Sequence, residues 1–121
     1  MATSFRDLRT WQHSMDLAVC VYRHTESFPK HEIYGLSQQM RRAAVSVASN
    51  IAEGKGRWTQ KEFRQFLFHA RGSLLELETQ IEIAHRLEYL SVQECERLQQ
   101  QAEQVGRGLA GLLNSLDVAA A

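Results

Sequence analysis

Apolar residues recur at three- and four-residue steps along almost the whole chain, and a single proline, Pro29, interrupts them. This spacing gathers apolar side chains on one face of a helix, whereas a half-buried strand needs alternation at every second position. No segment as long as a strand alternates in that way. The pattern therefore predicts an all-α protein and argues against a β-sheet.

The periodic pattern divides into four helical segments, at about residues 8–27, 33–53, 60–88 and 92–116. Glu32 and Leu36 are both candidate starts for the second segment. Because the connections are short, neighbouring helices are expected to be antiparallel, which gives an up-down four-helix bundle. The length of 121 residues is usual for one domain, so we expect residues 1–121 to form a single bundle.

Each segment carries an apolar stripe that we expect to face the core. In the fourth segment this stripe runs from Val92 to Leu116. Gly54 is expected to end the second segment, because glycine is the most common residue just after a helix. The first segment is expected to bury the stripe formed by Leu8, Trp11, Met15, Ala18, Val19 and Tyr22.

The third segment has more apolar surface than one core requires. Phe68 and Leu75 lie one heptad apart and roughly opposite its main stripe, with Ile83 nearby. The second segment is also apolar over more than half of its circumference. Helices that are apolar on two sides are usually buried on two sides. We therefore expect a homo-oligomer in which the second and third helices supply much of the contact; the alternative is scattered surface hydrophobes, which are common.

Charge is divided unevenly along the chain, although the net charge is zero. Residues 1–71 hold 11 Lys and Arg against 6 Asp and Glu, whereas residues 72–121 hold 3 against 8. Such asymmetry is typical of a basic working surface opposite an acidic one, and it is also compatible with solvated helix faces.

The basic half contains a glycine-rich stretch, Glu53 to Thr59, just before the third segment. It lacks the spacing of a phosphate-binding P-loop. It does place cations and an indole at a helix N-terminus, where free N–H groups favour anions. Cations beside a stacking aromatic suit a phosphate backbone with exposed bases, although an ordinary solvated turn would have the same composition. The candidate nucleic-acid-binding residues are Lys55, Arg57, Trp58, Lys61, Arg64 and Arg71.

Two rows of polar residues follow the second and third segments, and each mixes hydrogen-bond donors with acceptors. We interpret them as a structural polar network that sets how the helices fit together. The alternative is an active site in which Glu53, His69 and Glu76 act as acid or base. The candidate network residues are Arg42, Ser46, Asn50, Glu53, Ser73 and Glu76.

Other chemistries find no support in the sequence. The GxGxxG match at residues 106–111 lies within the fourth helical stripe rather than after a strand, so we interpret its glycines as sites of close helix approach. Cys20 and Cys95 are too few and too far apart for a metal cluster or a disulfide framework, and the histidines lack ligand spacing. We expect no cofactor, no metal and no catalytic residue. Nor does any segment resemble a signal peptide or a membrane span.

Several ordered motifs resemble the four-helix bundle family of 23S rRNA intervening-sequence (S23-like) proteins. The resemblance extends from about Phe5 to Leu90. It rests on the stretches around Phe5-Arg-Asp7-Leu8, Phe28-Pro29, Tyr34-Gly35-Leu36, Asn50-Ile51-Ala52-Glu53-Gly54 and Gly72-Ser73.

That resemblance implies a small bacterial cytoplasmic protein with no established enzymatic activity. Related accessory variability proteins of diversity-generating retroelements assemble as pentamers and bind nucleic acid and a reverse transcriptase. The resemblance thus implies a homopentamer whose partners are rRNA or another structured nucleic acid, or a nucleic-acid-handling protein. The alternative function is a protein–protein interaction scaffold that makes no direct nucleic-acid contact.

Overall fold

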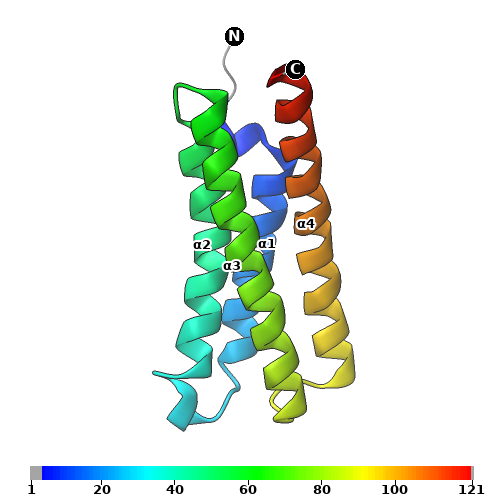
Figure 1. Ribbon diagram of the computed structural model, residues 1–121. Helices are drawn as coiled ribbons and strands as arrows, with labels where there is room; N and C mark the ends of the chain where they lie inside the picture. Colours follow the sequence, from blue (N-terminus) through cyan, green and yellow to red (C-terminus); the bar gives the residue numbers. More distant parts are fainter. Residues whose placement is uncertain (1–3, 121) are drawn as a thin grey trace.

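The computed structural model describes residues 4–120, with side chains described for residues 4–116, and it contains four long helices (Figure 1). Residues 4–120 include no strand, so the all-α prediction is confirmed. Short 3₁₀ helices at Phe5–Asp7 and Lys30–Glu32 precede the first and second long helices. The long helices are α1 (Arg9–Thr25), α2 (Leu36–Lys55), α3 (Gln60–Arg86) and α4 (Val92–Ala120).

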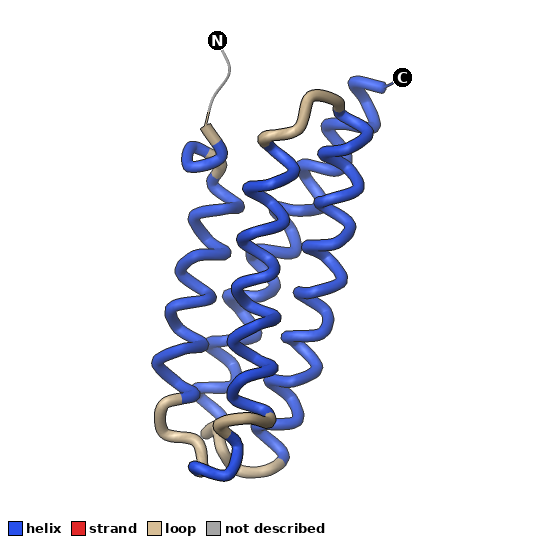
Figure 2. Tube along the Cα trace, turned by 90° about the vertical axis from the view of Figure 1, so that its left-hand side faces the viewer, coloured by secondary structure: helices blue, strands red, loops and turns tan. Residues whose placement is uncertain are grey.

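Each long helix packs against two others. α1 and α3 both lie beside α2 and α4, whereas within residues 4–120 the backbones of α1 and α3, and those of α2 and α4, lie diagonally across the core and do not approach each other. The α2–α3 turn lies at the same end of the molecule as the start of α1 and the end of α4, and the other two connections lie at the opposite end (Figures 1 and 2). The α1–α2 and α3–α4 pairs therefore form opposite sides of the bundle. No helix within residues 4–120 combines the length and hydrophobicity that crossing a bilayer requires.

Of the two candidate starts for α2 the structure has the later one, and the helix ends beyond the predicted residue 53. The helix begins at Leu36, whose N–H donates to Oε1 of Glu32 at 3.0 Å after the intervening turn. It continues through Gly54 to Lys55, so the prediction that Gly54 ends the helix is wrong. Gly54 is needed instead for close packing, because a Cβ there would lie 2.7 Å from Cβ of Phe66.

The other helices also differ from prediction at their ends. α1 stops at Thr25 rather than at about 27. α3 stops at Arg86 because Glu88 adopts a left-handed backbone, with φ of 65°, in the turn that follows. α4 continues to Ala120 rather than ending at about 116, since residues 117–120 include no helix-breaking glycine or proline.

The core runs along the axis of the bundle, and every helix contributes fully buried aliphatic side chains to it. Burying one such side chain is worth about 1.5–3 kcal/mol. Val92, which we expected in the core stripe of α4, is instead 56% exposed, because it lies in the first turn beyond the reach of the other helices. The largest fully buried side chains are Leu17, Val21, Met40, Val47, Ile51, Leu67, Leu77, Ile81, Leu98, Val105 and Leu109.

The orientation of α1 confirms part of the sequence prediction and corrects the rest: Ala18 is buried and Leu8 and Trp11 pack against the core, but the other three predicted residues do not. Its buried face contains Ser14, which is 0% exposed, together with Thr10 and Thr25. Val19 and Tyr22, assigned to the core from the sequence, are 45% and 44% exposed, and Met15 is exposed as well. Small hydroxyl side chains can be buried because they bond to their own helix: the Ser14 hydroxyl donates to the carbonyl of Trp11 at 2.6 Å.

Small side chains also set the distance between α1 and α4. Gly108 faces Thr10, and a Cβ added at Gly108 would lie 2.9 Å from Cγ2 of Thr10. The expectation of close helix approach therefore holds for Gly108. A Cβ at Gly111, by contrast, would meet no heavy atom within 4 Å.

Replacing Gly108 should therefore destabilise the fold, whereas replacing Gly111 should not. We expect Gly108→Ala to lower the free energy of unfolding by about 1–2 kcal/mol, since overpacking outweighs the gain in helix propensity. The control Gly111→Ala should raise it by up to about 1 kcal/mol. Urea unfolding followed by circular dichroism measures both, and equal stabilisation in the two variants would contradict the close contact.

A second local feature joins the two connections at the end opposite the α2–α3 turn. The Tyr89 hydroxyl donates to Oε2 of Glu32 at 2.9 Å, while Oε1 accepts the Leu36 N–H. The Leu36 N–H and then the Tyr89 hydroxyl lower the pKa of Glu32 below its ordinary value. The same hydrogen bond raises the pKa of Tyr89.

These pKa shifts predict how the stability of Tyr89→Phe depends on pH. The Glu32 pKa is depressed in the fold, so the stabilisation it provides exists above its unfolded pKa and is lost as pH falls through the folded value. The Tyr89 pKa is raised, so its stabilisation is lost as pH rises through that value. Tyr89→Phe should be less stable than the native protein between about pH 4 and about pH 10, and the difference should shrink outside this window.

Urea unfolding across this pH range measures the difference, and NMR titration should show the pKa of Glu32 rising in the variant. Tyr34→Phe is the control, because Tyr34 is exposed at the same end and should leave both quantities unchanged. A difference between Tyr89→Phe and the native protein that does not vary with pH would contradict the charge-assisted bond.

Candidate nucleic-acid interface

The α2–α3 turn places four of the six candidate nucleic-acid-binding residues together at one end of the bundle. Lys55 is the last residue of α2, Arg57 and Trp58 lie in the turn, and Lys61 lies in the first turn of α3. Trp58 is 98% exposed, so its indole is open to solvent on both faces. We refer to Lys55, Arg57, Trp58 and Lys61 as the turn cluster.

The start of α3 contributes to the electrostatics of this end. The Thr59 hydroxyl accepts the N–H of Glu62 at 3.1 Å and so caps the helix. The positive end of the helix dipole points toward the turn cluster, which favours an anion there. The carboxylate of Glu62, in the first turn, offsets part of that potential.

Three cations near the turn lie over phenylalanine rings. The guanidinium of Arg57 is 4.6 Å from the ring centre of Phe66, and the ammonium of Lys55 is 5.9 Å from that of Phe63. The guanidinium of Arg64 lies 5.6 Å from the ring centre of Phe68. Such contacts are worth about 0.5–1 kcal/mol at exposed sites and hold the cations close to the protein surface.

The remaining two candidates, Arg64 and Arg71, lie farther along α3 on either side of Phe68. Residues 61, 64, 68, 71 and 75 follow one another at three- and four-residue steps, so they share one helix face. That face therefore also holds the two residues assigned to an oligomer contact, Phe68 and Leu75. The predicted RNA-binding residues and the predicted oligomer contact therefore share this face, whereas the turn cluster lies at the end of the bundle, apart from Phe68 and Leu75.

The structure brings together three of the candidate network residues between α2 and α3. The hydroxyls of Ser46 and Ser73 lie 2.8 Å apart, and the Asn50 amide donates to the Ser46 carbonyl at 2.8 Å and to its hydroxyl at 3.0 Å. The Ser46–Ser73 bond joins the two helices near the middle of each, whereas the Asn50 bonds lie within α2 and orient the Ser46 hydroxyl.

Arg42 and Glu76 lie on the same seam as Ser46 and Ser73, in a shallow hollow of about 300 Å³. Glu76 accepts a hydrogen bond from the amide of Gln80 at 3.2 Å. Glu53 does not line this hollow and is exposed to solvent near the α2–α3 turn.

The acid and base candidates do not converge. Glu76 lines the seam, Glu53 is exposed nearer the turn, and the ring of His69 is 6.1 Å from that of Phe66. Within the part of the chain that the structure describes, no three His, Cys, Asp or Glu side chains are placed to hold a metal ion. Cys20 and Cys95 are unpaired, and burial raises the pKa of each thiol, which disfavours the reactive thiolate.

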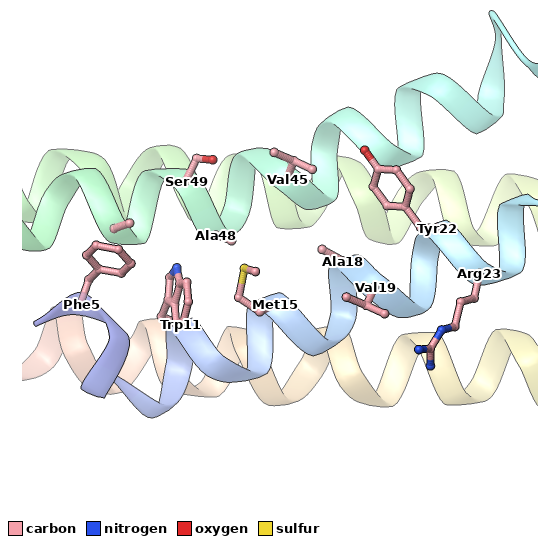
Figure 3. Close-up of a pocket in the computed structure, with 11 residues that line it drawn as sticks. Phe5, Trp11, Met15, Ala18, Val19, Tyr22, Arg23, Val45, Ala48 and Ser49 are labelled. Atoms are coloured by element: carbon pink, nitrogen blue, oxygen red, sulfur yellow. The ribbon is translucent and has the colours of Figure 1, made fainter.

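Sequence reasoning missed an apolar groove of about 680 Å³ between α1 and α2 (Figure 3). The signal was present but ambiguous. A second periodic stripe in α1 consists of residues 10, 14, 17, 21 and 25. Because three of its members are small and polar, this stripe is less hydrophobic than the one predicted to face the core. The residues lining the groove include Phe5, Trp11, Met15, Val19, Tyr22, Arg23, Val45 and Ala48.

Comparison with known proteins agrees with this architecture. A crystal structure of a protein of unknown function from the S23 ribosomal protein family of Bacteroides thetaiotaomicron superposes with a TM-score of 0.78 at 20% identity. The match covers 86% of this chain and 97% of that one, and at this identity it shows a shared fold. No curated protein matches the chain.

The sequence profile of the 23S rRNA-intervening sequence protein family matches residues 6–111, which is most of the chain. The matched region contains α1, α2, α3, the α2–α3 turn and most of α4. It therefore includes every candidate site residue described above, and this chain belongs to the 23S rRNA-intervening sequence protein family.

Proposed function

We propose that this protein is a non-enzymatic binding protein of the bacterial cytoplasm that associates with structured RNA or a ribonucleoprotein. The observation that carries the proposal is the turn cluster, in which a fully exposed indole lies beside three cations at a helix N-terminus. The cations would contact phosphates and Trp58 would stack on an unpaired base. The reference to 23S rRNA in the family's name supports this choice of ligand.

The same proposal takes the active species to be a homo-oligomer of antiparallel up-down bundles. The alternating ends at which the connections lie in Figure 1 support the antiparallel order. Exposed Phe68 and Leu75, at 45% and 55%, support association between copies, because they share one helix face. Five copies is the number implied by resemblance to the retroelement accessory proteins, and each ring would then present five turn clusters.

Retention of a structured rRNA fragment on a filter, measured across salt concentrations, tests the RNA proposal. Phosphate contacts release counterions, so affinity should fall steeply with salt. Lys55→Gln, Arg57→Gln and Lys61→Gln together should weaken binding and reduce the salt slope by about 2–3. Trp58→Ala should weaken binding about 5- to 150-fold with little change in slope, since stacking is worth about 1–3 kcal/mol per base.

Matched controls lie at the opposite end of the bundle. Lys30→Gln removes an exposed cation there and Tyr34→Ala removes an exposed aromatic ring, and neither should change RNA binding. Binding that does not depend on salt, or none at low salt, would refute direct RNA contact. It would leave the protein-interaction scaffold as the better explanation.

Light scattering coupled to gel filtration tests the oligomer. A homopentamer should have a mass near five times the 13.8 kDa of one chain, independent of RNA. A mass equal to one chain at micromolar concentration would contradict the homo-oligomer, and any other multiple would correct the number of copies.

A further inference from the structure

Two apolar surfaces of the bundle lie open on opposite sides of it. One is the α1–α2 groove, and the other is the α3 ridge, which we define as Phe68, Leu75 and Ile83. We infer that the α3 ridge of one copy packs into the α1–α2 groove of the next copy. This inference rests on the homo-oligomer proposed above and names the two surfaces that form its contact.

The composition of α1 indicates that a protein surface covers the groove. The helix buries three hydroxyl residues, Thr10, Ser14 and Thr25, beside Leu17 and Val21, while three larger side chains lie outward along the groove (Figure 3). The outward residues are Met15, Val19 and Tyr22. A helix gains more by burying its large apolar side chains than its hydroxyls. The outward side chains of α1 are therefore more stable when a second apolar surface covers them and excludes water.

The α3 ridge is a continuous surface of matching character. Two shallow hollows between α3 and α4 adjoin along it and share Leu75 and Glu78 in their lining. Phe68 lines the first hollow and Ile83 lines the second. The ridge thus extends over residues 68–83, about 22 Å of helix, which is enough to occupy a groove between two helices.

The two surfaces also lie at the same height along the bundle. Thr10 faces Gly108, and a Cβ at Gly106 would touch Leu74, so Thr10 is level with about residues 72–74 of α3. Counting one residue for each 1.5 Å places Met15 and Val19 level with about residues 77 and 81. The Ser46–Ser73 hydrogen bond places Val45 beside Leu75 in height. Copies standing side by side with parallel axes therefore bring ridge and groove together without an axial shift.

Charge at the end of each surface that lies farthest from the α2–α3 turn favours the same pairing. Arg23 lines the groove beyond Tyr22, at about the height of residue 85 of α3. Glu78, Glu82 and Arg86 line this part of the ridge, and Arg86 is ion-paired with Glu82 at 3.1 Å, so Glu78 is the carboxylate that Arg23 would approach. Burial and then the neighbouring Glu103 raise the pKa of Glu78, so an approaching arginine would relieve a local excess of negative charge.

The contact is heterologous, because the two surfaces differ and lie on opposite sides of each copy. Heterologous contacts build rings or filaments, whereas a two-fold dimer would pair one surface with itself. This difference can be tested by cross-linking. The proposed pairing also predicts that Arg64 and Arg71, which flank Phe68, lie beside the subunit contact. The turn cluster would then be the group that faces RNA.

A short bis-maleimide applied to single-cysteine variants tests the pairing. Met15→Cys and Leu75→Cys are each made in a Cys20→Ser, Cys95→Ala background, and circular dichroism confirms that each variant folds. We expect cross-linked dimers when the two variants are unfolded, mixed and refolded together, and none from either variant alone. Gln104→Cys, on an exposed part of α4, is the control and should not cross-link to Met15→Cys.

A fluorescence measurement covers the case in which the cysteine variants do not fold. In a Trp58→Phe background, Trp11 is the remaining tryptophan and lies in the groove. Leu75→Glu should then reduce the mass to that of one chain and shift the Trp11 emission to longer wavelength, because the groove becomes wet. An exposed residue such as Leu75 can be replaced without loss of the core.

Several outcomes would overturn the pairing. They are cross-links within a single variant, a multimeric mass with no cross-link in the mixture, or a Leu75→Glu variant with unchanged mass and emission. If another molecule or a chain end filled the groove, one of the last two of these outcomes would be observed. RNA retention by the native protein is measured separately, so a failed pairing with intact salt-dependent binding would refute this inference alone.

Discussion

The structure depends on how closely α1 approaches its neighbours, and small side chains make that approach possible. Thr10 faces Gly108 of α4 where no Cβ intervenes, and Ser14 is completely buried with its hydroxyl bonded to its own helix. This face also buries Leu17 and Val21, so Met15, Val19 and Tyr22 lie outside the core. The α1–α2 groove, and through it the proposed contact between copies, follows from this one choice of face.

The outer face of α3 changes in charge and hydrophobicity from one end of the helix to the other. Near the α2–α3 turn it is basic, with cations lying over phenylalanine rings, and toward the other end it becomes apolar and then acidic. An apolar contact excludes water, whereas phosphate binding requires charged groups that remain accessible. The order along the helix allows both, because the cations needed for RNA are concentrated at the end of the bundle and the apolar residues lie below them.

The helices themselves followed from residue spacing, and the exposure of Phe68 and Leu75 followed from their place opposite the main stripe of α3. The start of α2 was ambiguous because the local pattern did not show that Glu32 would accept the Leu36 N–H. Gly54 was misassigned for a related reason. Its role depends on Phe66, which approaches from another helix, and a pattern within one segment carries no information about that approach.

The sequence by itself determined that this chain forms four amphipathic helices, that its charge is divided between its halves, and to which family it belongs, because these properties depend on periodicity, composition and ordered motifs. Only the tertiary structure decided which of two stripes on α1 faces the core, which glycines permit close packing, and which apolar residues remain open. Those outcomes depend on the shapes of neighbouring helices, and steric fit between α1 and α4 outweighed the greater hydrophobicity of the stripe that lies outward.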